Sequence, residues 1–213
     1  PYDILINSDD VNVKPTVQTL LKERYPDLAN TNLYHEFHFA NRLDYSTSGV
    51  LCVALHKKSC AAAVKAFETR TAKKYYLALL RGLLQNECIN IDEPIGEDKR
   101  HKQDNHKMCV ASNDNCEGAR EASTRILILA TGLFNGKDAT KVLIKPCTGR
   151  RHQIRVHCQF IGHPIVGDYT YGSQEDKEPY RMFLHSYRLI LPNAIEDVDV
   201  QAKDPFLETD PKN

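Results

Sequence analysis

A carboxylate and a guanidinium stand two positions apart, at Asp44 and Arg42. In an extended segment alternate side chains point the same way, so these two groups would share one face while Leu43 points into the core. A neighbouring guanidinium lowers the pKa of an aspartate by about 1 to 3 units and keeps it ionised. Such a carboxylate suits a nucleophile and does not suit a general acid. An ordinary structural ion pair beside a turn is the alternative interpretation.

A second group of charged side chains follows the turn formers Thr148 and Gly149. Apolar residues at helical spacing predict a helix that begins near Arg151; they are Ile154, Cys158 and Ile161. That helix would place Arg151, His152 and Arg155 on one face near its positive end. Guanidinium and imidazole groups in this position form an arrangement that binds anions.

The elements that position these residues follow from the local patterns. Residues 46–49 predict a turn and residues 50–55 a strand, while Thr16 begins one helix and residues 59–70 form another. Strands are expected at 73–82, 123–130 and 141–145, the last two joined by a turn at 132–136. Residues 86–122 are polar and predict a long, partly mobile insertion, and the acidic segment 194–213 predicts a strand and a loose end.

Composition describes an ordinary globular protein of 213 residues, with 28 basic and 28 acidic side chains. The charges are unevenly spread, because residues 69–86 and 139–167 contain no acidic side chain. A basic face on a neutral protein is compatible with a phosphate-backbone partner, and a solvated face is the alternative.

The seven cysteines include no CxxC pair, so we expect reduced thiols. His101, His106, Cys109 and Cys116 fit no tetrahedral spacing, and we expect no metal.

Four segments in order resemble the RluA-type pseudouridine synthases. They are Arg42-Leu-Asp44-x-x-Thr-Ser-Gly49, Lys74-x-Tyr76-x-Ala-Leu, Thr148-Gly-Arg-x-His-Gln-Ile-Arg155-x-His157 and Gly162-His-Pro-Ile-x-Gly-Asp168-x-x-Tyr-Gly172. A later segment, Leu184-His-Ser186, also resembles the family. Asn41 stands where the family usually has histidine. We interpret Asp168 as structural rather than catalytic.

The resemblance implies a single α+β (mixed α/β) domain over residues 1–213, with a largely antiparallel central sheet flanked by helices and a cleft across the sheet. It implies isomerisation of uridine to pseudouridine in RNA, without metal or other cofactor. Asp44 would attack the nucleoside at the base or at C1′, Arg155 would pair with Asp44, and Tyr76 would pack on the flipped uracil. Candidate RNA contacts are Arg42, Lys74, Lys141, Lys145, Arg150, Arg151 and His152.

Two other classes of function remain open at this point. One is an RNA-binding module without turnover on the same fold, and the other is an unrelated hydrolase with Asp44 as nucleophile.

The expected partner is RNA (tRNA, rRNA or mRNA), with no membrane, and the chain is expected to be a monomer. No apolar stretch reaches membrane-spanning length. We expect an intracellular protein of the cytoplasm or nucleus, with the mitochondrion as the alternative because the sequence opens at Pro1 without methionine.

Overall fold

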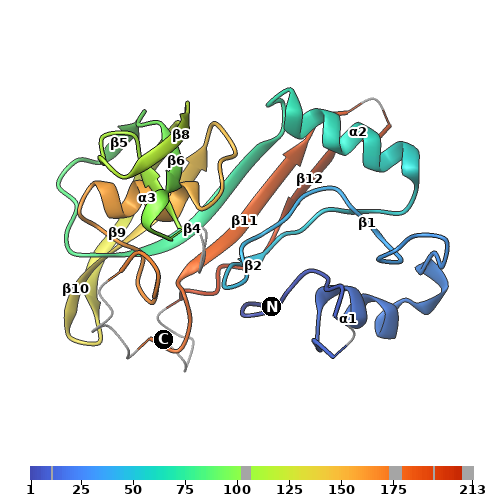
Figure 1. Cartoon of the computed structure of the whole chain (residues 1–213). Helices are drawn as coiled ribbons and strands as arrows, with labels where there is room; N and C mark the ends of the chain where they lie inside the picture. The colour runs from blue at the N-terminus through green and yellow to red at the C-terminus, as the bar shows by residue number, and fades with distance from the viewer. Residues whose placement is uncertain (11, 102–106, 173–178, 194, 208–213) are drawn as a thin grey trace. The chain divides into compact units, whose positions relative to one another are not determined.

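The structure, a computed structural model, describes residues 1–10, 12–101, 107–172, 179–193 and 195–207. Its internal contacts divide the chain into two compact units, whose elements are drawn in Figure 1. The first contains Pro1–Lys73 and Arg188–Ala202, and the second contains Lys74–Tyr187 and Lys203–Asn213. Strands and helices occur in both, which agrees with the predicted α+β class. Among the described residues, no helix combines the length and apolar character needed to cross a membrane.

The first unit begins with helix α1, Val17–Arg24, followed by the 3-10 turn Pro26–Leu28. Thr16 caps α1 as predicted. Its hydroxyl accepts the Thr19 N–H at 3.1 Å, and the Thr19 hydroxyl accepts the Thr16 N–H at 2.9 Å. This reciprocal pair satisfies two backbone donors that the helix itself leaves unmatched. The capping box thus marks the start of α1, and the Val17 and Gln18 N–H groups are bound by the Leu5 and Ile6 carbonyls.

The strands of the first unit are shorter than the sequence predicts. Strand β1, His38–Phe39, pairs antiparallel with β3, Val53–Ala54, and β2 is Ser48–Gly49. The predicted strand 50–55 is thus reduced to two residues. The Asn41 side chain accepts the Cys52 N–H at 2.9 Å, so a side-chain bond stands where a ladder bond would continue the strand.

Helix α2, Lys57–Glu68, supplies the main apolar contact of the first unit. Its Ala63 and Ala66 pack against Leu189 and Leu191, which lie in the second half of β11, Leu184–Leu191. Strand β12, Val198–Gln201, pairs antiparallel with that half of β11. The predicted helix at 59–70 and the predicted strand in the acidic tail are both confirmed, with bounds shifted by a few residues.

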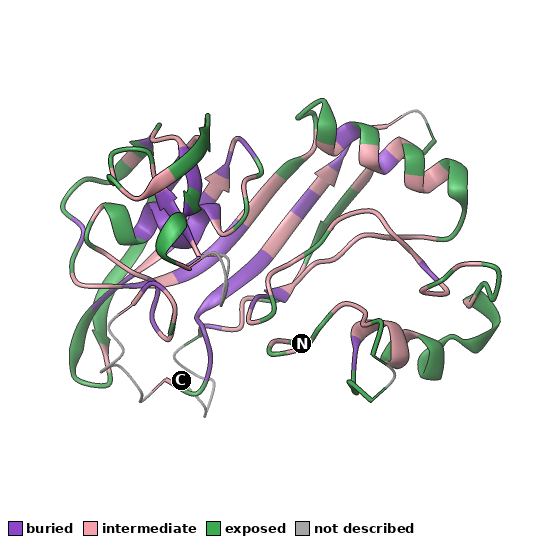
Figure 2. Ribbon diagram, viewed as in Figure 1, coloured by how far each residue is buried: buried purple, intermediate pink, exposed green. Residues whose placement is uncertain are grey.

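The second unit contains an antiparallel sheet of β4, Lys73–Arg81, with β10, Lys137–Pro146, β9, Thr124–Phe134, and β5, Cys88–Ile91. The first half of β11 extends the sheet beside β4, and the order is β11-β4-β10-β9-β5. Buried residues follow β4 and β11 in Figure 2. Asn135 and Gly136 alone turn the chain between β9 and β10, both with positive φ, so the turn is tighter than predicted and Gly132 lies inside β9.

The polar segment 86–122 forms more structure than we expect from its sequence. Strands β6, Ile95–Asp98, β7, Met108–Val110, and β8, Cys116–Arg120, make a sheet in the order β7-β6-β8. The described part of this segment is therefore built of strands, and the expected partial mobility stays a prediction. The segment needs few apolar residues of its own to form this sheet, because Ile95 and Met108 share a core with Val156 and Tyr171 from later in the chain. The 3-10 turn Lys99–His101 follows β6, and His106 lies outside the described residues.

Gly96, in the centre of the three-stranded sheet, has no room for a side chain. A Cβ atom there would stand 2.3 Å from the Glu117 carbonyl oxygen and 2.7 Å from the Cys116 sulfur. We expect Gly96→Ala to lower the free energy of unfolding by about 3 kcal/mol, because β8 must move away from β6. Gly132→Ala is the matched control, since its Cβ would meet nothing within 4 Å. Urea unfolding of both variants tests this, and equal midpoints would contradict it.

The C-terminal segment 203–207 packs onto the second unit. The centroids of the Phe206 and Phe183 rings are 5.3 Å apart. The Arg181 guanidinium lies over the Phe206 ring, 5.4 Å from its centroid. Lys141 Nζ donates to Asp204 Oδ2 at 2.6 Å and to the Phe206 carbonyl at 3.0 Å. The Lys141 ammonium and the packing of the Phe206 ring therefore both hold the segment 203–207 in place.

His185 lies beside this segment and makes stability depend on pH. Burial, with a smaller contribution from Arg181, lowers its pKa to about 4, whereas Asp204 acts in the opposite direction. The unfolded chain binds a proton near pH 6.5 and the folded chain does not, so stability falls as the pH is lowered from about 6.5 towards 4. We expect a slope of order 1 kcal/mol per pH unit in urea unfolding.

His185→Gln removes this titration and should flatten the slope, even if it lowers stability at pH 7. Burial also lowers the pKa of His157, which leaves a smaller slope of the same sign. Asp98, whose pKa is about 2, stays ionised in the folded chain throughout this range, but the unfolded aspartate begins to bind a proton near pH 4, so Asp98 adds to the slope only at the acid end of the range. An unchanged slope in His185→Gln would show that other groups carry the acid sensitivity.

Candidate active site

Asp44 lies in the first unit at the start of a tight turn. Its carbonyl oxygen accepts the Thr47 N–H at 2.9 Å, so the turn lies at 44–47, earlier than the predicted 46–49, of which Ser48 and Gly49 form β2; Asp44 is half-buried. It borders a largely apolar cavity of about 220 Å³. The other lining residues are Pro1, Ile4, Ile6, Val17, Leu21, Leu43, Thr47, Gly49, Leu51 and Val53. The turn thus holds one carboxylate at the edge of an apolar hollow.

The expected pair between Arg42 and Asp44 is absent. Residues 40–47 form no strand, so their side chains do not alternate across a sheet. Arg42 is exposed and has no ion pair with any residue in the described part of the chain. Its guanidinium is therefore available at the surface rather than committed to the carboxylate.

Tyr76 lies in the second unit on β4, opposite Ile144 of β10. Only 9% of the residue is exposed, and Tyr75, on the other face of the strand, is half-buried. Lys74 precedes Tyr76 by two positions and points to the same face. The pairing of β4 with β10 thus fixes the backbone at Tyr76.

Arg155 lies on helix α3, Gln153–Phe160, and its guanidinium is held by Asp168. Nε donates to Oδ2 at 2.7 Å and Nη2 donates to Oδ1 at 2.8 Å. The Asp168 Oδ1 atom also accepts the N–H groups of Thr170 and Tyr171, and the guanidinium lies 4.9 Å from the centre of the Tyr171 ring. Asp168 is buried, so this two-pronged pair fixes the direction of Arg155.

The predicted cationic face of α3 is wrong. The helix begins at Gln153, after His152 in a left-handed conformation with φ of 54°. Arg151 therefore precedes the helix and is exposed, whereas Arg155 is buried. His152 Nδ1 is 2.8 Å from the Tyr171 hydroxyl. These three groups therefore do not lie on one face of α3, and their contact with RNA stays a prediction.

Asp44 belongs to the first unit, and Tyr76 and Arg155 belong to the second. The pair between Asp44 and Arg155 stays a prediction. Asp168 as the partner of Arg155 was not identified from the sequence, although one signal points to it. It is the first acidic residue after the acid-free stretch 139–167.

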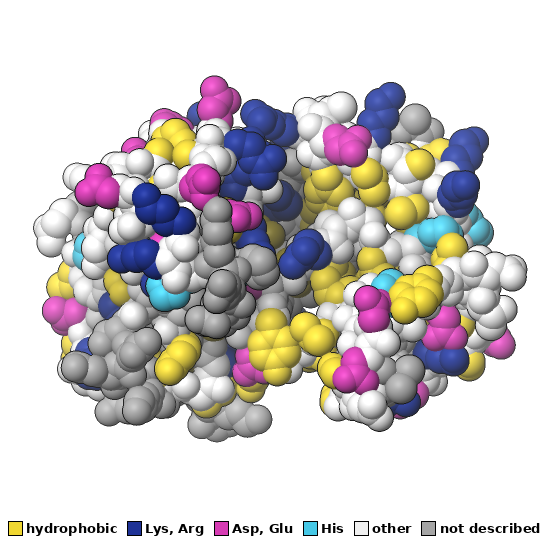
Figure 3. Space-filling view, viewed as in Figure 1, with side chains coloured by type: hydrophobic (Ala, Val, Ile, Leu, Met, Phe, Trp, Pro, Cys, Tyr) yellow, Lys and Arg dark blue, Asp and Glu magenta, His cyan; other side chains and the backbone are white. Residues whose placement is uncertain are grey.

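The residues predicted to contact RNA differ in whether their side chains already form hydrogen bonds or ion pairs within the protein. Lys141 is bound by Asp204 and by the Phe206 carbonyl, so it is a poor candidate for a phosphate contact. Arg150 is partly used, because its Nε donates to the Glu121 carbonyl at 2.8 Å. Lys145 is half-buried and has no ion pair with the other described residues. In Figure 3 several Lys and Arg side chains adjoin one another, with acidic side chains interspersed nearby.

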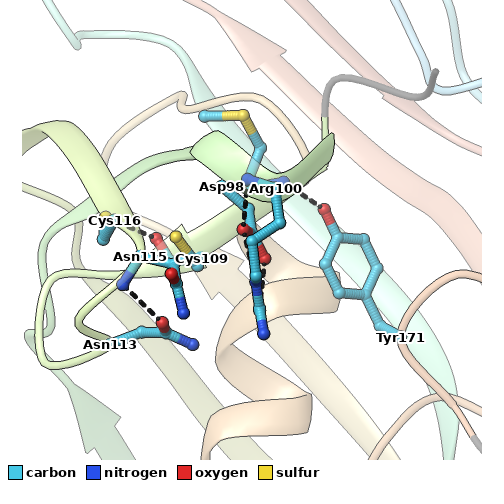
Figure 4. A network of polar contacts seen from close by, with 8 residues as sticks. Asp98, Arg100, Cys109, Asn113, Asn115, Cys116 and Tyr171 are labelled. Carbon is cyan, nitrogen blue, oxygen red and sulfur yellow. Dashed lines mark hydrogen bonds and ion pairs between the residues drawn. The ribbon is translucent and has the colours of Figure 1, made fainter. Parts of the chain in front are cut away.

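The three-stranded sheet carries a polar network that Figure 4 shows at close range. Arg100 holds the buried Asp98 with two hydrogen bonds, of 2.9 and 2.6 Å, and thereby lowers the pKa of Asp98 to about 2. Cys116 donates to the Cys109 carbonyl at 3.4 Å. Burial and Cys116 raise the pKa of Cys109 to about 12, and a thiol so difficult to ionise is a poor metal ligand. The described residues contain no group of three side chains that could hold a metal.

The comparisons with known proteins agree on one family. Residues 1–160 match the family described as RNA pseudouridylate synthase. RNA pseudouridylate synthase domain-containing protein 1 of Danio rerio is 45% identical over 97% of this chain and 70% of its own length. The human protein of the same name is 42% identical, over 97% of this chain and 66% of its own length. The chain thus spans about two thirds of these relatives.

Solved structures give the same result. The structure titled Human RNA Pseudouridylate Synthase Domain Containing 1 superposes with a TM-score of 0.86 at 40% identity, covering 97% of this chain and 78% of that one. The chain belongs to the RNA pseudouridylate synthase family. Its resemblance to the RluA type is also confirmed: a dual-specificity RNA pseudouridine synthase RluA of Vibrio parahaemolyticus is 34% identical, over 79% of this chain and 62% of its own length.

Proposed function

We propose that this chain isomerises uridine to pseudouridine in RNA, with Asp44 as the nucleophile. The observation that carries the proposal is family membership across residues 1–160, which include Asp44, Tyr76 and Arg155. The reaction breaks the bond between N1 and C1′ and forms a bond between C5 and C1′. C5 loses a proton and N1 gains one, so atoms balance and no oxidant or reductant is consumed.

The surroundings of Asp44 suit a nucleophile in this reaction. The turn at Asp44–Thr47 fixes the backbone, and the adjoining cavity is apolar apart from Asp44 and Thr47. A carboxylate beside apolar surface is weakly solvated, and weak solvation makes an anion more reactive. Asp44 attacks either the base or C1′, and the proposal holds for both routes.

Tyr76 and Arg155 are proposed to serve the base and the charge that develops. The buried Tyr76 presents a ring on which a flipped uracil can pack, with its hydroxyl near the proton that leaves C5. Asp168 takes two of the five guanidinium hydrogens of Arg155, so the donors on the Nη1 side are those that a substrate or Asp44 would meet. Arg42, exposed and unpaired among the described residues, is proposed to fill the space that the flipped base leaves.

Pseudouridine mapping tests the proposal. Cellular RNA from a strain lacking this protein is incubated with the wild type or with Asp44→Asn, labelled chemically and read by primer extension. New stops with the wild type alone are expected, and they would also show whether the substrate is a tRNA, an rRNA or an mRNA. Stops with neither protein, together with RNA binding that weakens as salt is added, would instead indicate a binding module without turnover.

A further inference from the structure

Lys74 is a half-buried lysine for which the described residues supply no counter-charge. It has no hydrogen bond or ion pair with any other described residue. The two stretches that surround it, residues 69–86 and 139–167, contain no acidic side chain. Burial lowers the pKa of its ammonium. A cation in such a place reduces the stability of the fold, which indicates a role outside folding.

The position of the ammonium is well defined. Its Nζ atom lies 3.5 Å from the point where a Cβ atom would stand on Gly149, and Gly149 is exposed. The absence of a side chain at 149 therefore leaves the ammonium open to an approaching ligand at this turn.

Gln153 holds this turn rigid from the first residue of α3. Its Oε1 atom accepts the Thr148 hydroxyl at 2.7 Å and the Arg150 N–H at 2.9 Å. The Thr148 hydroxyl also accepts the Ser123 N–H at 3.0 Å. A ligand at Gly149 would therefore meet a preformed surface that includes the Lys74 ammonium.

Lys74 also lies close to the residue proposed to hold the base. It is on the same face of β4 as Tyr76, and two residues along a strand span about 7 Å. That distance is within the size of one nucleotide. An anion bound by Lys74 would thus belong to the nucleotide at Tyr76 or to its neighbour in the RNA chain.

We propose that Lys74 and the turn at Thr148–Gly149 form a binding site for one backbone phosphate of the RNA, beside the base at Tyr76. This inference rests on the proposed function, because RNA supplies the anion. A phosphate fits better than a base carbonyl, since an anion offsets the desolvation of the ammonium and a neutral oxygen does so only in small part.

The test compares Lys74→Met and Lys74→Arg with Lys73→Met, the neighbouring lysine, which is exposed on the opposite face of β4. Binding of a short fluorescein-labelled oligouridylate is measured by anisotropy at several KCl concentrations. We expect Lys74→Met to weaken binding about 5- to 10-fold and to reduce the salt slope by about 0.7. Lys74→Arg should keep the slope, and Lys73→Met should stay within about twofold of the wild type.

Thermal unfolding separates this role from a structural one. Because Lys74→Met removes a desolvated charge without breaking a contact, its melting temperature should equal or exceed that of the wild type. A lower melting temperature, or wild-type affinity and salt slope in Lys74→Met, would overturn the phosphate site and leave the proposed function intact. A wild-type protein that binds no oligouridylate and forms no pseudouridine would overturn both.

Discussion

Asp44→Asn is expected to slow pseudouridine formation by at least about 10³-fold, the scale of effect seen when a nucleophile is removed. The amide matches the carboxylate in size but cannot attack. Single-turnover conversion of an RNA that the wild type modifies is the measurement. The turn bond to Thr47 is made by the Asp44 carbonyl, so the substitution leaves this bond in place, and thermal unfolding of the variant checks that the fold is retained.

RNA binding by Asp44→Asn provides the control for this result. Loss of one negative charge near a polyanion should leave the affinity unchanged or slightly increased. A variant that binds RNA normally and still forms pseudouridine at more than about a hundredth of the wild-type rate would remove Asp44 from the mechanism. Loss of binding together with loss of stability would point to a damaged fold instead.

Asp168→Asn is expected to lower the free energy of unfolding by about 3 kcal/mol. The substitution removes the charge of Asp168 beside the buried Arg155 guanidinium, while the amide oxygen can still accept the backbone N–H groups of Thr170 and Tyr171. Urea unfolding at pH 7 measures the loss. We also expect slower pseudouridine formation, because Arg155 then lacks the group that directs it.

The pair of Arg188 and Asp199 is a matched control for this effect. It has the same two-pronged geometry, with bonds of 2.8 and 2.6 Å, but both side chains are largely solvated. Asp199→Asn should leave stability nearly unchanged, since water screens an exposed pair. Equal effects at 168 and 199 would show that burial is not what makes the Arg155 pair important.

Local signals in the sequence predict the elements well. Thr16 caps α1 as expected, and the strand predicted at 73–82 is found as β4, Lys73–Arg81. Caps, turns and alternation depend on residues a few positions apart, and a sequence displays those directly. The four motifs in order were sufficient to identify the family, which the comparisons confirm.

Partners that are distant in the chain could not be read in the same way. Lys141 was expected to face RNA, but Asp204, more than sixty positions later, binds it. The three-stranded sheet within residues 86–122 was not predicted, because the residues that complete its core, Val156 and Tyr171, lie beyond the segment. Neither the Lys141–Asp204 pair nor the shared core of the three-stranded sheet leaves a periodic signal in the sequence, since each depends on which surfaces folding brings together.

The bond between Arg155 and Asp168 has a consequence for how the family changes over time. A buried charge without its partner costs more than the loss of both, so a single replacement at either position lowers fitness before a second can restore it. The two positions should therefore vary together among relatives, and an arginine retained without its aspartate should be rare. An arginine that is invariant at this position would then report on the stability of the fold as well as on catalysis.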